Sequence, residues 1–293
     1  MLHPAALLVL SLGLGAAVPA QDALDQLDAS FHQAYLLARG EARSRSGPVL
    51  LVAGDHLQFW RDGTQVAGAT IRPPLYHRLK AVDHVPLGVS LLLGEPGRAR
   101  AEDLRRCRDR IRAARADLGA WCPPDLRPRQ EQILDACGEL LDQRLDRGRL
   151  EPGHLARCAA RLGPPLLANA AAAAVLELER LDLEVGRIRT GLGAGEWPSL
   201  RVVVLGSHMA RDREVALQYF TRLLGEPGEG GRVVFAEGAD GPGAALDLLA
   251  VHRLDGALGA AFFGDPGRMH RDVLADGARR WLDRHLPAAG GTR

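Results

Sequence analysis

The chain has 293 residues, of which 46% are hydrophobic and 25% charged, and its formal net charge is +1. This length and composition are typical of a folded chain with one large or two modest domains. A net charge near zero provides no global field for nucleic acid, so nucleic acid is excluded as an expected partner.

Residues 1–20 have the pattern of a secretory signal peptide. The apolar run from Ala5 to Val18 is too short to span a bilayer and has the length of a signal-peptide core. Small residues follow, and Val18-Pro19-Ala20 offers a cleavage site before Gln21. A membrane anchor and a buried helix are the alternatives. We expect export, either to the periplasm or out of the cell, and no transmembrane segment in the mature chain.

The first elements after this segment are a helix and two strands. Apolar residues at helical spacing predict an amphipathic helix over 22–39, and a polar loop over 40–47 follows it. A strand is expected over 49–53, inside the segment 48–60. Asp62-Gly63 predicts a turn into a second strand over 65–71. A mostly apolar helix over 75–93 comes next, interrupted at Pro86.

The middle of the chain, residues 98–192, is predicted to be helical throughout. Helices over 98–118 and 129–147 each carry an apolar seam, and the short link between them predicts an antiparallel hairpin. The first of these helices is rich in arginine but has no interleaved aromatic residues, which is typical of a solvated face. A third, long helix is expected over 165–189.

The last third of the chain has the pattern of a βαβ unit. A Gly-rich linker over 191–198 precedes a strand over 201–205, a helix over 212–224 and a strand over 232–236. Helices over 243–263 and 270–286 follow. The predicted fold is α/β and mostly helical, with a small parallel or mixed sheet. We expect one domain over 21–293, with sheet-forming parts at 49–97 and 198–293 and a large helical insertion at 98–192.

Polar residues follow three of the predicted strands. Asp55 and His56 follow the first, His208 follows the strand over 201–205, and Glu237 follows the next. Ligands of open α/β sheets bind beyond the carboxyl ends of strands, so these four are the candidate catalytic residues. His56, His208 and Glu237 are also candidate ligands of a divalent metal, although the sequence specifies no cofactor. The alternative is that they are polar loop residues that close the strands.

The same strand ends offer groups that would bind a substrate or a small anion. Gly54 and Gly206 allow close approach of a ligand to the backbone, and Ser207 adds a hydroxyl. Arg211 enters the start of the following helix, where free N–H groups and the helix dipole favour an anion. A capped helix start with solvated arginine side chains is the alternative.

The order of a strand with Gly206 and His208, a helix, and a strand with Glu237 resembles the superfamily of erythromycin esterases, ChaN-like haem-binding proteins and TraB-type proteins. Gly54, Asp55 and His56 add to the resemblance. Ser207 stands where that group has Glu, and the spacing from Gly to His is one residue shorter. The resemblance implies a shared topology in the C-terminal part of the chain, and a shared fold does not define an activity.

All four cysteines fall in the helical middle of an exported chain, which favours disulfides. Cys107 and Cys137 lie on the seams of the predicted hairpin at equal distances from its link, so we expect them to pair. Cys122 and Cys158 would then pair by elimination. The alternative is four reduced, buried cysteines that act as small apolar residues.

Three function classes remain open. The first is an exported hydrolase that uses the His and carboxylate residues at the strand ends on a small-molecule substrate. The second is an exported protein that binds haem, a metal or a small anion without catalysis, with His77, His84 or His208 as an axial ligand. The third is a scaffold whose helical middle binds a partner.

Overall fold

The computed structural model describes residues 32–54, 56–94, 100–193, 195–205, 218–225, 232–235 and 278–286. These residues divide into two compact units. The helical unit comprises 74–173, and the sheet unit comprises the described residues of 32–73, 174–235 and 278–286. The expectation of a single domain over 21–293 stays a prediction.

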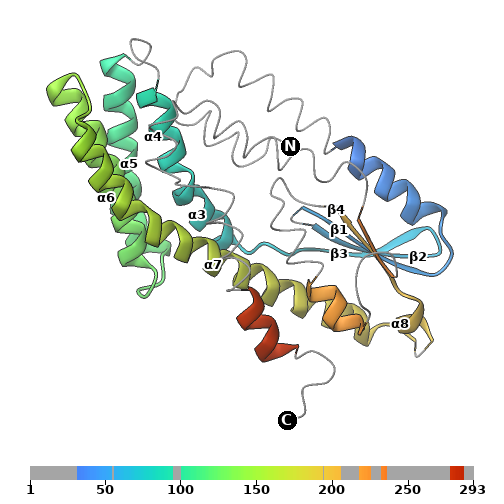
Figure 1. Ribbon diagram of the computed structural model, residues 1–293. Coiled ribbons are helices and arrows are strands. Elements are labelled where there is room, and N and C mark those ends of the chain that lie inside the picture. The colour runs from blue at the N-terminus through green and yellow to red at the C-terminus, as the bar shows by residue number, and fades with distance from the viewer. Residues whose placement is uncertain are drawn as a thin grey trace. The chain divides into compact units, whose positions relative to one another are not determined.

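The sheet unit is built on one mixed sheet in the order β3-β2-β1-β4-β5. Its strands are β1 (Pro48–Ala53), β2 (His56–Arg61), β3 (Thr64–Thr70), β4 (Arg201–Leu205) and β5 (Val233–Phe235). β1 is antiparallel to β2 and parallel to β4, and β5 is parallel to β4. Strands that lie far apart in the sequence therefore join one small sheet, which confirms the predicted fold class (Figure 1).

Every residue of β1 is buried, because helices pack against both faces of this strand. Leu50 and Val52 pack with the later part of α7 (Pro152–Thr190), including Leu178, and with the helical residues 218–224. Val49, Leu51 and Ala53 pack with the helical residues 32–44. Burial on both faces explains why β1 and β4 are continuous apolar runs instead of alternating ones.

The two hairpin turns depend on residues that tolerate positive φ. Asp62 and Gly63 have φ of 48° and 77°, as in the type of turn that the sequence predicted. A Cβ added at Gly63 would lie 2.5 Å from the carbonyl oxygen of Arg43, so glycine is required there. Gly54, with φ of 58°, turns the chain directly from β1 into β2. The segment 48–60 therefore holds two strands, where the sequence indicated one.

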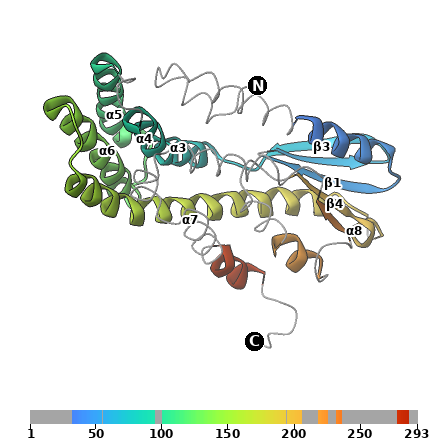
Figure 2. The same cartoon turned by 45° about the horizontal axis from the view of Figure 1, so that its top comes forward.

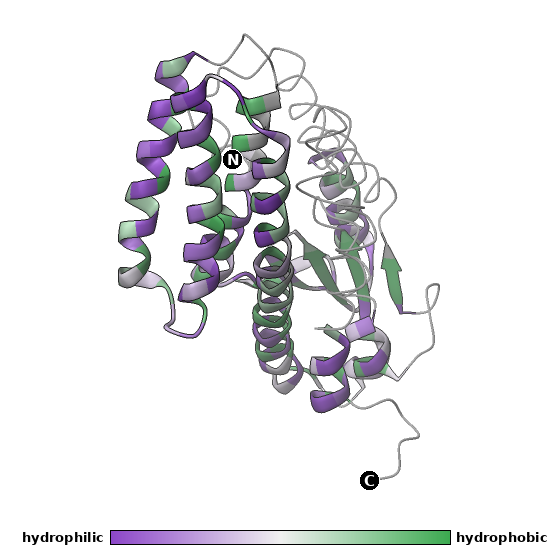
Figure 3. Cartoon of the chain, turned by 60° about the vertical axis from the view of Figure 1, so that its left-hand side comes forward, coloured by the Kyte–Doolittle hydropathy of each residue, from purple (hydrophilic) through white to green (hydrophobic). Residues whose placement is uncertain are grey.

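The helical unit holds α3 (Pro74–Asp83), α4 (Val85–Gly94), α5 (Ala101–Trp121), α6 (Arg127–Arg147) and the first part of α7. α5 and α6 lie side by side as the expected hairpin (Figures 1 and 2). Their apolar seams form the core of this unit, whereas hydrophilic residues occupy much of the remaining surface of the helices (Figure 3). Amphipathic patterning thus placed both helices correctly.

α7 begins at Pro152 and not near Pro165, which corrects the predicted boundary. Two prolines, Pro164 and Pro165, lie inside it. Pro165 has no N–H for the carbonyl of Arg161, one helical turn earlier. Gln132 on α6 replaces this donor, because its Nε2 donates to the Arg161 oxygen at 2.8 Å. A tertiary hydrogen bond thus helps the helix to continue through a proline pair that normally ends one.

Within the described residues, α7 is also the one helix whose length and apolar composition would allow it to cross a membrane. The core helix of a folded protein can have the same length and apolar composition. α7 buries Leu162 and Leu166 in the helical unit, and Leu178, Leu181 and Val185 in the sheet unit. The most apolar 18-residue window of α7 is 38% buried.

Two segments that the sequence predicts to be a loop and a linker contain helical structure. Helical structure continues to residue 44 inside the expected loop 40–47. The short helix α8 (Glu196–Ser199) lies inside the expected Gly-rich linker. Glu196 accepts a hydrogen bond from the Gly193 N–H at 2.7 Å and forms an ion pair with Arg61 at 2.8 Å, so side-chain contacts order this segment.

Candidate functional site

The carboxyl ends of three parallel strands meet at one edge of the sheet. Ala53, the last residue of β1, is level with Leu205, the last residue of β4. Val204 is level with Phe235, the last residue of β5. The Gly54 N–H also donates to the Leu205 carbonyl oxygen at 3.4 Å. This edge, which we call the carboxyl edge, has the position at which open α/β sheets bind ligands.

Two of the residues predicted at the strand ends are described, and so are the candidate axial ligands His77, on α3, and His84, directly after α3. Gly54 forms the turn after β1, and His56 is the exposed first residue of β2, paired with Ala53. His56 thus starts a returning strand and does not belong to a long loop. The other residues predicted at the strand ends lie outside the described residues, and their convergence stays a prediction: Asp55, Gly206, Ser207, His208, Arg211 and Glu237.

The cysteines differ from expectation, because all four are buried free thiols. The expected Cys107–Cys137 disulfide is therefore not formed, although the hairpin does bring these two residues into one core. Burial raises the pKa of Cys107 to about 11 and that of Cys137 well above its ordinary value. Neighbouring Cys107 and Cys158 raise the pKa of Cys137 further. The thiols pack as small apolar residues, which was the alternative interpretation.

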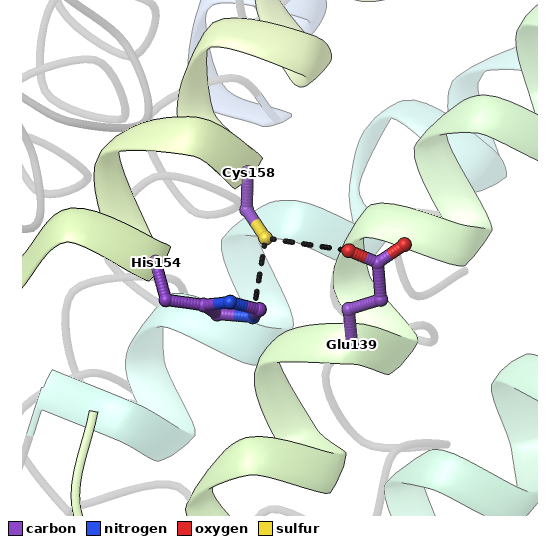
Figure 4. Close-up of side chains that lie close together, drawn as sticks. All are labelled: Glu139, His154 and Cys158. Atoms are coloured by element: carbon purple, nitrogen blue, oxygen red, sulfur yellow. Dashed lines mark hydrogen bonds between the residues drawn. The ribbon is translucent and has the colours of Figure 1, made fainter. Parts of the chain in front are cut away.

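A second group of chemically active side chains lies in the helical unit. Glu139 on α6 and His154 and Cys158 on α7 point toward one another (Figure 4). The Cys158 Sγ lies 3.6 Å from His154 Nε2 and 3.8 Å from Glu139 Oε2. Each residue offers one ligand atom, and all of these atoms lie within 4.8 Å of one another. We call this group the Glu-His-Cys cluster.

Solvent exposure increases across this cluster from Cys158 through His154 to Glu139. Cys158 is 1% exposed, His154 is half-buried, and Glu139 is exposed. The positions follow from helix geometry, because His154 and Cys158 are four residues apart and so share one face of α7. That face packs against α6, which carries Glu139. The cluster thus extends from the core of the helical unit to its surface.

Two arginines flank the cluster. Arg161 Nη1 donates to both carboxylate oxygens of Glu139, at 2.7 and 2.6 Å. Arg157 Nη2 lies 3.4 Å from His154 Nδ1. Because arginine only donates, this contact assigns an acceptor role to Nδ1 and places the imidazole proton on Nε2, the nitrogen nearer Cys158.

The chemistry of the cluster does not favour a cysteine nucleophile. Burial, with a contribution from the Glu139 carboxylate, raises the pKa of Cys158 to about 11. A reactive cysteine requires a thiolate at neutral pH. Glu139 accepts a hydrogen bond from the thiol and none from the imidazole, and among the described residues no other carboxylate is hydrogen-bonded to His154. The same three atoms do form a suitable donor set for a metal ion.

Sequence reasoning did not single out Glu139 or His154. The available signal was a His and a Cys four residues apart on one helix, His154 and Cys158. The third ligand comes from a different helix, and no sequence spacing indicates that contact. Cys158 was considered only as a partner in a disulfide.

Comparisons with known proteins identify no family. No family model matches the chain, and no curated protein matches it. One solved structure is similar, described as a "putative secreted protein" from Legionella pneumophila, with 13% sequence identity and a TM-score of 0.47. The match covers 89% of this chain and 71% of the other. A similarity of this size carries no conclusion about fold or function.

Proposed function

We propose that this chain is an exported hydrolase whose active site lies at the carboxyl edge of β1, β4 and β5. The observation that supports the site is the parallel register, which brings the ends of these three strands to within one residue of the same level. Export is proposed from the signal-peptide pattern of residues 1–20. The description of the Legionella protein is compatible with export but adds no support at its level of similarity.

The roles of the residues follow from their chemistry. His208 directly follows Gly206-Ser207 after β4 and is the proposed general base, because imidazole accepts and donates protons near neutral pH. Glu237, two residues after β5, is the proposed carboxylate that orients the histidine or accepts a proton. His56 is the first residue of β2 and pairs with Ala53 at the end of β1, and Asp55 precedes it in the sequence. A divalent ion held by the histidines and Glu237 would supply Lewis-acid activation of water.

The test of catalysis uses mature protein that begins at Gln21, screened against esters, amides and phosphoesters. We expect an activity that falls by about 100-fold or more in His208→Ala and Glu237→Gln, which is the scale of a lost acid–base group. His32→Ala is the matched control, because His32 is an exposed histidine on the helical residues 32–44. Equal activity in all variants, or none in the wild type, would overturn the proposal. A ligand that co-purifies and is lost in His208→Ala, without turnover, would identify a binding protein instead.

The test of export is the N-terminal mass of the protein after expression of the full chain in a bacterial host. We expect the species outside the cytoplasm to begin at Gln21, because Val18-Pro19-Ala20 provides small residues before the scissile bond. An intact chain from Met1, retained in the cytoplasm, would contradict this expectation.

A further inference from the structure

We propose that Glu139, His154 and Cys158 bind a divalent ion of the zinc class in the helical unit. This site is separate from the carboxyl edge and does not depend on the proposed hydrolase activity. It is made entirely of described residues, two on α7 and one on α6.

The distances among the three side chains match those of a metal site. Zinc bonds of about 2.3 Å to sulfur and 2.0–2.1 Å to imidazole nitrogen, at a tetrahedral angle, place these two atoms about 3.6 Å apart. The Cys158 Sγ lies 3.6 Å from His154 Nε2 and 3.8 Å from Glu139 Oε2. Both distances are thus close to the edge length of a tetrahedron of ligands around a zinc ion. A small movement of the exposed Glu139 carboxylate would complete one triangular face of that tetrahedron.

The donor types indicate which ions would bind. A thiolate and an imidazole favour zinc and neighbouring transition metals, whereas magnesium and calcium prefer oxygen donors. Three protein ligands leave one tetrahedral position for water. Since Glu139 is exposed, the cluster reaches the surface of the unit.

The charges around the cluster are compatible with a bound ion. Metal binding releases the Cys158 proton to solvent, and the resulting thiolate and the Glu139 carboxylate together neutralise a divalent charge. A carboxylate has about four lone-pair sites, so one oxygen of Glu139 can bind the metal while the other keeps its hydrogen bond to Arg161.

Arg157 opposes metal binding in a way that can be tested. Its contact with Nδ1 favours the tautomer with a proton on Nε2, whereas metal binding needs a lone pair on Nε2. Arg157 is exposed and can move away at low cost. In Arg157→Gln the amide oxygen can accept a hydrogen bond from Nδ1–H, as second-layer partners of metal-bound histidines do.

The experiment is a titration of the mature protein with Co²⁺, followed by displacement with Zn²⁺. We expect one ion per chain at this site, with a thiolate-to-cobalt charge-transfer band and the intense visible bands of tetrahedral cobalt. Cys158→Ser should lose the charge-transfer band. Glu139→Gln and His154→Ala should each weaken binding by at least about 10-fold, and Arg157→Gln should strengthen it by roughly 10-fold.

Three comparisons keep the result decisive. Cys122→Ser removes another buried thiol and should leave the cobalt spectrum unchanged. Glu139→Gln alters an exposed residue with little change of shape, so it tests the site even if Cys158→Ser unfolds the core. Absence of the charge-transfer band in the wild type, or an equal spectrum in Glu139→Gln, would overturn the proposal. Metal lost in His208→Ala but not in His154→Ala would place the ion at the carboxyl edge instead.

Discussion

A reciprocal pair of buried amides in the helical unit offers the sharpest test of the fold. Gln130 on α6 and Asn169 on α7 are both fully buried. Each amide nitrogen donates to the other's oxygen, at 2.6 and 2.8 Å. Asn169 Nδ2 also donates to Asp83 Oδ1, at 2.9 Å, which ties α3 to the pair. The network satisfies polar groups in an otherwise apolar core, so its loss should be costly.

We expect Asn169→Leu to lower the free energy of unfolding by about 2–4 kcal/mol. Removal of one partner leaves the Gln130 oxygen without this donor and deprives Asp83 of one, at roughly 1–3 kcal/mol for each buried group. Gln130→Met should cost about 1–3 kcal/mol for the same reason. In the double variant both amides are gone, and apolar replacement of both partners is far less costly than the loss of one.

The double variant should therefore be more stable than the sum of the single effects predicts, by about 2 kcal/mol. Urea denaturation followed by circular dichroism gives each free energy, and hydrogen exchange in peptides from α6 and α7 locates the change. Gln65→Met is the matched control, because Gln65 lies exposed on β3. Additive single effects would refute the reasoning, because they would mean that the two amides do not depend on each other.

Three further predictions follow from other contacts. Gln132→Ala should lower the free energy of unfolding by about 1 kcal/mol in the natural chain. The loss should be smaller in the Pro165→Ala background, because the new backbone N–H of residue 165 can donate to the same Arg161 carbonyl. Urea denaturation of the natural chain, both single variants and the double variant gives the coupling energy. Tyr219→Phe should lower the free energy of unfolding by about 2 kcal/mol, since this fully buried hydroxyl donates to a carboxylate on α7 at 2.8 Å; equal stability would contradict that. The free energy of unfolding should fall as pH rises from about 9 to 11, by up to ~1.4 kcal/mol per pH unit for each thiol. The reason is that Cys107 and Cys158 keep their protons up to about pH 11 in the folded state, whereas they release them near pH 9 in the unfolded state. A Cys107→Ala chain should show a smaller slope, and an unchanged slope would assign the effect to other groups.

Periodicity predicted most of the described helices and strands because these elements bury faces of regular spacing. α5 and α6 each have one apolar seam, and β1 and β4 are buried on both faces, so helix and strand patterns were unambiguous there. The errors arose where tertiary contacts override local rules. α7 continues through Pro164 and Pro165 with help from a side chain on α6, and no pattern within α7 itself contains that information.

The candidate sites could be predicted only where the order and direction of the strands determine which residues meet. Residues at strand ends share an edge once the strands are parallel, and that arrangement is confirmed for β1, β4 and β5. The side-chain convergence of His208 and Glu237 stays a prediction, since both lie outside the described residues. The Glu-His-Cys cluster depends on the register between α6 and α7, which a single sequence does not specify.

Buried thiols and export are compatible because oxidation depends on the thiolate. Burial raises the pKa of Cys107, Cys137 and Cys158, so each is almost entirely protonated at neutral pH and reacts slowly with oxidants. A free thiol can therefore persist in an oxidising compartment when the core excludes water. Cys158 differs from the other two because it also contacts a histidine and an exposed carboxylate. A metal ion would deprotonate this thiol but shield it by coordination, so the proposed site would allow an exported protein to keep a reactive ligand beside a reduced core.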